Sequence, residues 1–523
     1  MKSFSVAMAA LGFAGLVFIG TPSVHGQPQG NQTAGAAAPV QRPRPVLQVQ
    51  PLLDPDGRVR DEAFVPGPPL AAADRVYTDI DGHRMKSVVN DVVAISRRSR
   101  DDGNRYWGRI AGTKYEVMTG DLIEAKFKSL GLVDVHRKEF PLRPQWFPID
   151  WSLTATQAGK SQTFRTVLPA LSSVPIRGAL DVDAVWVGLG TAADFAGRDV
   201  RGKAVVFHTM LAPGEMGQSA VFEGTIHRAE EAGAVALIGI WGYYDNYAVW
   251  QSLGRTVYSA DVKIPGFWMG FEDGKRLRDQ LAAGPTRVNL SLTTEMREGL
   301  KTQSVYGSLR GTSDENVIVL AHMDSWFDGA LDNASGISVM LTLAEHFSKV
   351  PQASRRRNII FVGTAGHHVG SPNSTYLRDE RPDLLAKTAL LINCEHVAAA
   401  QTLNWSTQLR ETTGVAARRW WVNGSPRLFD IVLNAYHTFG VNIVGDMDPS
   451  ASGEMGAIDT LAPSIQIIHS PEIKHTDHDV PEIVPAVGLE SVGRAYAKII
   501  AEVNKLDLKT VQPARPGNQT GGR

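Results

Sequence analysis

The sequence predicts an α/β fold in three layers, with a mostly parallel, mixed sheet covered by helices on both faces. Within residues 301–505, the apolar runs "NVIVLAH", "RNIIFVG", "TALLIN" and "PSIQIIH" alternate with helix-like segments such as "ISVMLTLAEHF". Strands buried on both faces read as unbroken apolar runs, and their alternation with helices favours parallel pairing. With 43% hydrophobic and 20% charged residues, a chain of 523 residues can bury a large core. The net charge of −1 leaves no basic excess for binding nucleic acid.

Two further regions precede this core. Residues 73–164 are expected to supply its N-terminal part, because apolar residues from Met85 to Val92 recur at helical spacing and a second helix is expected over about 115–130. The strand-like "VDVHRKEF" follows. Residues 165–300 have a different texture, since short apolar strands such as "GKAVVFHT" and "AVALIGI" are separated by glycine. They predict a small β-rich domain inserted into the chain.

The two ends of the chain predict export and flexibility. Residues 1–26 combine one lysine, a short apolar run and a small-residue cleavage site, which is typical of a secretory signal peptide. Residues 27–72 are rich in Pro, Gln and Ala, and residues 506–523 resemble them, so both are expected to be flexible. We therefore expect a periplasmic or extracellular protein with no membrane span once the signal is removed. Cys394 is the only cysteine, so no intrachain disulfide can form.

Each of the four apolar runs ends in a cluster of histidine or carboxylate residues. Ligands of parallel sheets gather at the carboxyl ends of strands, and zinc accepts nitrogen and oxygen ligands. A single histidine at a strand end is more often a satisfied polar residue, but coincidence at four ends favours a metal site. The clusters comprise His322, Asp324, Asp328 and Asp332; His367 and His368; Glu395 and His396; and His469, His475, Asp477, His478 and Asp479.

Together, "HMDSW…GALDNASG" and the late "KHTDHD" resemble the zinc exopeptidases of metallopeptidase family 28, which include aminopeptidases and glutamate carboxypeptidases. The resemblance covers about residues 76–505, and makes 301–505 the metal-binding peptidase core. Within 165–300, "AEEAGAVALIGI…IPGFWMGFEDGKRL" resembles the protease-associated domain inserted in many members. The family's fold is the three-layer α/β arrangement expected above.

The resemblance implies roles for individual residues. His322 corresponds to a ligand of one zinc, with Asp324 behind it orienting the imidazole, and Asp332 corresponds to the carboxylate that bridges two metals. Glu395 stands where the family usually has an aspartate ligand of the first zinc. His475 matches the late histidine that binds the second zinc.

The segment "FVGTAGHHVG" departs from the family pattern "F-x-G-A-E-E-x-G". His367 stands at the position of the general base, and His368 at that of a carboxylate ligand of the second zinc. Imidazole binds zinc well, so His368 can retain coordination. Imidazole can also accept a proton, but nearby metal ions would make His367 a poorer base. With Asp332 and Glu395 as the only carboxylate ligands, the site is one unit more positive than usual.

Three functions remain open from the sequence. The first is an exported metal-dependent hydrolase that cleaves peptide or amide bonds like an exopeptidase, using one or two zinc ions or another divalent metal, with an altered site. The second is a non-catalytic metal- or ligand-binding protein on a peptidase scaffold. The third is zinc chemistry of the glutaminyl-cyclase type. A peptide or small amide is the expected partner in the first case, and the sequence fixes no oligomeric state.

Overall fold

In a computed structural model, the chain is described over residues 70–513 apart from 212–218, 223, 244, 254–261, 406–407 and 470–472, with 52–53 and 59–60 in addition. The expected signal peptide and almost all of the segment 27–72 lie outside these residues. Part of the expected flexible tail is helical instead, because the helix α11 covers Leu508–Val511. The Val511 side chain is fully buried, and its carbonyl accepts a hydrogen bond from Ser425 N.

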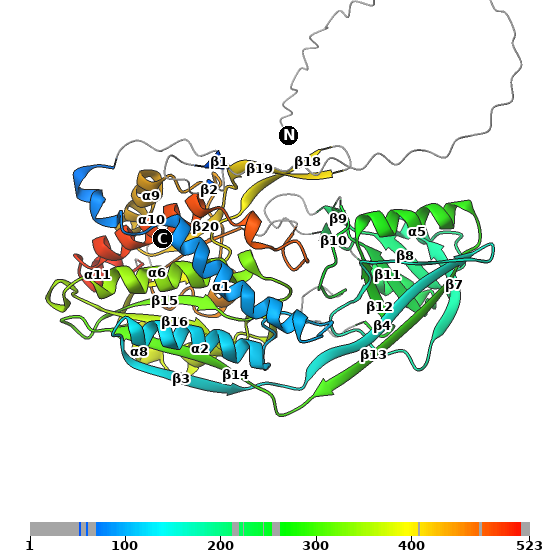
Figure 1. The fold of residues 1–523 in the computed structure, drawn as a ribbon, viewed down its shortest axis with the longest axis horizontal. Helices are drawn as coiled ribbons and strands as arrows, with labels where there is room; N and C mark the ends of the chain where they lie inside the picture. The colour runs from blue at the N-terminus through cyan, green and yellow to red at the C-terminus, as the bar shows by residue number, and fades with distance from the viewer. Residues whose placement is uncertain are drawn as a thin grey trace, which may run out of the picture. The chain divides into compact units, whose positions relative to one another are not determined.

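A seven-stranded mixed sheet forms the centre of the main domain (Figure 1). Its four central strands β21, β17, β15 and β16 are parallel, while β20, β14 and β3 run antiparallel to their neighbours. The predicted fold class is therefore confirmed. In sheet order, the strands are β20 (Arg419–Asn423), β21 (Ser464–Ile468), β17 (Thr388–Cys394), β15 (Asn316–His322), β16 (Asn358–Thr364), β14 (Lys301–Leu309) and β3 (Val133–Pro141).

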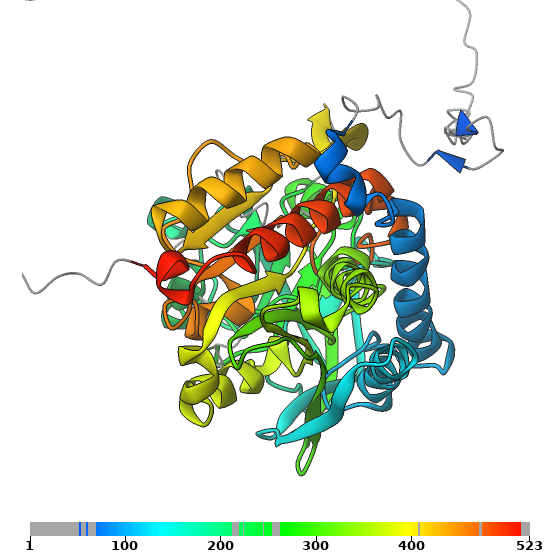
Figure 2. The same ribbon diagram turned by 90° about the vertical axis from the view of Figure 1, so that its left-hand side faces the viewer.

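Helices cover both faces of this sheet (Figure 2). Alternate residues of β15 divide between two cores, with Val317 and Val319 in one and Ile318 and Leu320 in the other. This alternation follows from the opposite directions of successive side chains along a strand. The first core is completed by α1 (Gly82–Asp101), α2 (Lys114–Ser129), α6 (Gly336–Ser348), α9 (Pro426–Phe439) and α10 (Ala486–Val503), and the second by α7 (Pro372–Asp379) and α8 (Pro382–Ala386).

A second sheet of eight strands lies between β3 and β14 in the sequence. It begins at Gln145, ahead of the expected boundary at 165, because β4 pairs with β13 along the whole length of that strand. The resemblance of this region to a protease-associated domain stays a prediction. Its strands in sheet order are β5 (Lys160–Thr163), β4 (Gln145–Gln157), β13 (Arg287–Arg297), β7 (Leu180–Trp186), β8 (Ala204–His208), β11 (Ala236–Ile240), β12 (Gly266–Met269) and β6 (Leu168–Pro169), and its helices are α3 (Ala192–Phe195), α4 (Thr225–Glu231) and α5 (Phe271–Ala283).

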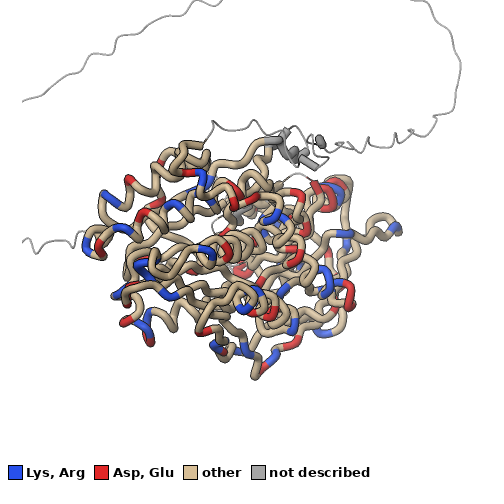
Figure 3. The backbone as a smooth tube through the Cα atoms, turned by 60° about the vertical axis from the view of Figure 1, so that its left-hand side comes forward, with Lys and Arg blue, Asp and Glu red and all other residues tan. Residues whose placement is uncertain are grey.

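Three short strand pairs lie outside the two sheets: β1 (Leu52–Leu53) with β2 (Val59–Arg60), β9 (Met210–Leu211) with β10 (Ser219–Ala220), and β18 (Ala400–Trp405) with β19 (Gln408–Val415). Among the described residues, none of the helices has the length and apolar character that crossing a bilayer requires. Basic and acidic residues are interspersed along the backbone in the view of Figure 3, in keeping with the near-zero net charge.

Candidate metal centre

The four parallel strands bring the predicted clusters to one edge of the main sheet. His322 is the last residue of β15, and the turn with His367 and His368 follows β16. Glu395 and His396 directly follow β17, and the loop of His475 comes after β21. Because these strands are neighbours in the order β21-β17-β15-β16, their ends meet at a common point.

Asp332 lies at the centre of the residues that meet there. It is 3% exposed, and its main-chain N–H and that of Leu331 donate to the Asp479 carboxylate at 3.1 and 2.6 Å. Its own carboxylate stands among imidazole nitrogens on both sides. Oδ1 lies 3.2 Å from His322 Nε2 and 2.9 Å from His396 Nε2, and Oδ2 lies 3.4 Å from His368 Nε2 and 3.0 Å from His475 Nε2.

These contacts fit metal ions. All four Nε2 atoms are buried, and among the described residues neither they nor Asp332 Oδ1 make a hydrogen bond of acceptable geometry. On three of the rings Nδ1 faces an oxygen. Nδ1 of His322 lies 3.1 Å from the Asp324 main-chain carbonyl, and Nδ1 of His368 lies 2.9 Å from the Asp324 carboxylate. Nδ1 of His475 lies 3.4 Å from the Gln251 side-chain amide oxygen. A neutral ring that donates from Nδ1 carries its lone pair on Nε2, where it faces a carboxylate oxygen. A divalent cation between them satisfies both atoms.

Among the described residues, four groups of three could each hold one ion, and two of these groups share Asp332. In each group the possible ligand atoms lie within 4.8 Å of one another. We call His322, Asp332 and His396 the inner group, and Asp332, His368 and His475 the outer group. Each group offers two nitrogens and one oxygen, which suits zinc and leaves a coordination position open.

His396 replaces Glu395 in the position facing Asp332. Glu395 instead forms a group with His322 and His367, and its Oε2 accepts a hydrogen bond from Asn393 Nδ2 at 2.7 Å. The resemblance implies the ligand role for Glu395 and none for His396. In the structure each of them completes a possible metal group with His322, Glu395 together with His367 and His396 together with Asp332. The backbone explains the exchange, because His396 has φ of 47°, in the left-handed region, so the chain turns as it leaves β17.

Asp324 holds a different ring from the one that the resemblance implied. Its carboxylate lies 3.9 Å from His322 Nδ1, which instead contacts the Asp324 main-chain oxygen. The carboxylate accepts from the main-chain N–H groups of His367 and His368 at 2.9 and 3.0 Å, and contacts His368 Nδ1 at 2.9 Å. Burial opposes its ionisation, but His368, His322 and His367 hold the pKa of Asp324 well below its usual range. Asp324 therefore fixes the histidine turn.

His367 lies outside both groups and between two carboxylates. Its ring stacks on His322, with centroids 4.1 Å apart and planes 11° from parallel. Nε2 lies 3.7 Å from Glu395 Oε1, and Nδ1 lies 3.6 Å from Glu454 Oε1. Burial lowers the pKa of His367, but Glu395, Glu454 and Asp324 outweigh it and raise the value to about 9. Ser374 Oγ donates to Glu454 Oε2 at 2.8 Å and holds it in place.

An aromatic side chain closes the outer group. The Trp326 ring lies 4.1 Å from the His368 ring and 4.7 Å from the His475 ring between centroids. Its Nε1 donates to Tyr106 Oη at 2.7 Å, which fixes the orientation of the indole. A rigid apolar wall beside imidazole ligands excludes water from that side of the centre.

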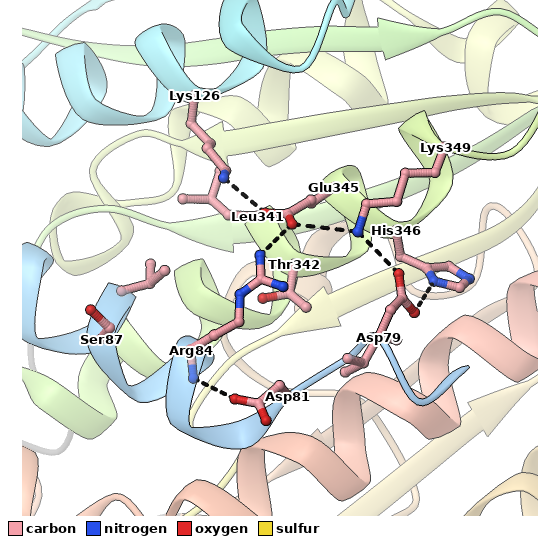
Figure 4. Close-up of a pocket in the computed structure, with 12 residues that line it drawn as sticks. Asp79, Asp81, Arg84, Ser87, Lys126, Leu341, Thr342, Glu345, His346 and Lys349 are labelled. Atoms are coloured by element: carbon pink, nitrogen blue, oxygen red, sulfur yellow. Dashed lines mark hydrogen bonds and ion pairs between the residues drawn. The ribbon is translucent and has the colours of Figure 1, made fainter. Parts of the chain in front are cut away.

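The hollow drawn in Figure 4 is a separate feature. It has a volume of about 220 Å³ and lies beside α1 and the C-terminal end of α6, whereas Asp332 precedes the N-terminal end of α6. Glu345 in this hollow pairs with Arg84 and Lys126, and Asp79 pairs with His346 and Lys349. Its charges are thus mutually balanced.

Comparisons with known proteins agree with this geometry. Residues 304–500 match the sequence profile described as Peptidase family M28. A probable glutamate carboxypeptidase of Zea mays is 31% identical over 28% of this chain and 20% of its own length, and an aminopeptidase of Bacillus subtilis is 28% identical over 48% and 50%. The chain thus spans half or less of these curated relatives.

Solved structures share the fold. A peptidase M28 precursor from Shewanella amazonensis superposes with a TM-score of 0.65 at 19% identity, over 84% of this chain and 99% of its own. A zinc aminopeptidase from Bacillus subtilis superposes with a TM-score of 0.58 at 21% identity, over 83% and 98%. Residues 304–500 therefore carry the sequence profile of peptidase family M28, within a main domain that has the fold of these solved structures.

Proposed function

We propose that this protein is an exported, metal-dependent hydrolase that cleaves peptide or amide bonds in the manner of an exopeptidase, with an altered metal site. The observation that carries the proposal is the Asp332 carboxylate, which faces four imidazole Nε2 atoms that make no hydrogen bond. The family match supports hydrolysis, since relatives in it are named aminopeptidase and glutamate carboxypeptidase.

Zinc is the cofactor that we propose, held by the inner and outer groups. Bound there, it would polarise a carbonyl oxygen and make a water molecule acidic near neutral pH. The chain's own contribution is to place the ligands. Asp479 holds the backbone of Asp332, and Asp324 holds both the backbone and the ring of His368. These fixed contacts reduce the reorganisation that substrate binding would otherwise require.

His367 is the residue that we propose for proton transfer. It stands at the base position of the resemblance, and its two ring nitrogens face Glu395 and Glu454. A proton held on Nε2 or Nδ1 is thus stabilised by a carboxylate on either side. The imidazole lies beside the inner group, because its ring stacks on that of His322 with centroids 4.1 Å apart. A leaving amine needs such a proton donor.

The contacts of His367 with two carboxylates also favour one alternative, a metal-binding protein that does not cleave its ligand. The pattern Glu395–His367–Glu454 keeps the imidazole paired with carboxylates, so it can act as a structural ion pair and not as a base. A binding protein would retain both metal groups and the substrate cleft of its family without turnover.

Metal analysis combined with hydrolysis of a peptide library, with and without chelator, tests the proposal. We expect about two zinc ions per chain and cleavage that chelator abolishes. His367→Ala should retain the metal and lose turnover, whereas His437→Ala on the exposed face of α9 is the matched control and should change neither. Zinc without any cleavage would favour the binding protein, and purified protein that takes up no zinc would sink both functions.

Export rests on residues 1–26, so its test is separate. Expression of the full chain should yield protein outside the cytoplasm whose first residue follows Gly26. Full-length protein retained in the cytoplasm would contradict export and leave the hydrolase proposal intact.

A further inference from the structure

A segment of the second-sheet region pairs with the loop that carries His475. Trp250 N donates to the His475 carbonyl at 3.0 Å, and Asp477 N donates to the Ala248 carbonyl at 3.0 Å. Val249 and Thr476 form an antiparallel bridge between these two contacts. The Asp477 carboxylate closes the pairing by accepting from Ala248 N at 2.9 Å. The second-sheet region therefore extends, by main-chain pairing, to the residue that provides one metal ligand.

The side chain of Gln251 continues this pairing to the imidazole itself. Its Oε1 lies 3.4 Å from His475 Nδ1, on the side of the ring opposite to Asp332. The Gln251 backbone is fixed in the second-sheet region, because its carbonyl accepts from Trp268 Nε1 at 2.8 Å and from Leu171 N at 3.0 Å. Gln251 thus connects the core of that region with the outer group.

The backbone and the ring of His475 both depend on contacts with their surroundings. Its φ of 62° lies in the left-handed region, which a residue with a side chain seldom adopts unless its surroundings hold it there. Its ring has two tautomers, and only the one protonated on Nδ1 presents a lone pair from Nε2 to a metal. An amide oxygen facing Nδ1 accepts that proton and selects this tautomer.

We propose that Gln251 is a positioning residue for the outer metal ion, so that the second-sheet region forms part of the metal centre. Gln251 orients the His475 ring and fixes its tautomer without contacting the metal. Among the described residues, the inner group contains neither His475 nor any contact with Gln251, and it shares only Asp332 with the outer group. The inference rests on the proposed function, because it requires the outer group to bind a metal.

Stepwise zinc titration against a chromophoric chelator, on the purified full chain, tests the assignment. Gln251→Leu removes the acceptor, and Gln251→Asn shortens it by one methylene with less disturbance of packing. Both should weaken one of the two zinc ions, the outer one, by about 10–100-fold, the usual cost of losing a partner behind a histidine ligand. The inner zinc should keep its affinity. Gln251→Glu supplies a carboxylate acceptor at the same reach and should retain or tighten the outer zinc.

Gln162→Leu on β5 is the matched control, because Gln162 is also half-buried and its side chain hydrogen-bonds only Gln280 among the described residues, away from the centre. It should leave both zinc affinities unchanged. The proposal is overturned if Gln251→Leu and Gln251→Asn bind both zinc ions like the wild type, if both ions weaken together, or if Gln251→Glu does not restore the outer one. A wild-type protein that binds no zinc would overturn the proposed function as well, which separates the two failures.

Discussion

Replacement of Asp324 by asparagine should destabilise the protein strongly while hardly changing its shape. The carboxylate accepts three hydrogen bonds, from His367 N at 2.9 Å, His368 N at 3.0 Å and His368 Nδ1 at 2.9 Å. An amide offers one oxygen, so its best orientation keeps the two bonds to His368 and turns its NH₂ group towards His367 N–H. One charge-assisted bond is then lost, at about 1.5–3 kcal/mol, and two become neutral, at about 1 kcal/mol each.

The sum for Asp324→Asn is about 3–5 kcal/mol in the free energy of unfolding, a large part of the roughly 5–15 kcal/mol that holds a domain together. Urea denaturation of the metal-free protein, monitored by tryptophan fluorescence, measures it. Asp181→Asn makes the same chemical change at an exposed surface pair and should stay within about 0.5 kcal/mol. A loss below about 1 kcal/mol for Asp324→Asn would refute the reasoning that this carboxylate holds the histidine turn.

Three other results are expected. Burial raises the pKa of Glu116 to about 8 from 4.5, so between these pH values the folded state keeps a proton that the unfolded state has released. Stability should therefore fall as pH rises through this window, by on the order of 5 kcal/mol, and Glu116→Gln should flatten the curve in denaturation series from pH 5 to 9. In competition titrations, His396→Ala should weaken zinc binding by more than roughly 100-fold, and Glu395→Gln should weaken it much less. Equal losses in the two variants would show that Glu395 is also a zinc ligand. Gly453→Ala should lower the melting temperature and displace Glu395 in a crystal structure. Gly453 has φ of 60°, and a Cβ there would come within 2.3 Å of Glu395 Oε2. An unchanged melting temperature would contradict this expectation.

The fold and most of the centre follow from the sequence because their signals are local. The unbroken apolar runs identify the parallel strands and the clusters at their ends, and the family resemblance selects His322, Asp332, His368 and His475 from those clusters. The pairing of β4 with β13 could not be predicted in the same way, because the paired residues lie more than a hundred positions apart and the sequence of one strand does not indicate its partner.

The details that sequence reasoning missed depend on backbone turns and rotamers. Glu395 and His396 are neighbours, and an extended chain would direct them to opposite sides. The left-handed φ of His396 decides which one faces Asp332, and no residue pattern encodes that angle for a histidine. Likewise the Asp324 carboxylate contacts His368 Nδ1 at 2.9 Å and lies 3.9 Å from His322 Nδ1, and the spacing of these residues in the sequence does not specify that choice.

The unequal burial of the two groups has a consequence for metal exchange. His322 and His396 are 0% exposed, whereas His368 and His475 are 7% and 5% exposed. The ligands of the outer position are therefore the more accessible to solvent. We expect the outer ion to leave first and quickly when a chelator is added, and the inner ion to follow slowly as a second kinetic phase. Isotopically labelled zinc added to the loaded protein should accordingly appear at one site long before the other.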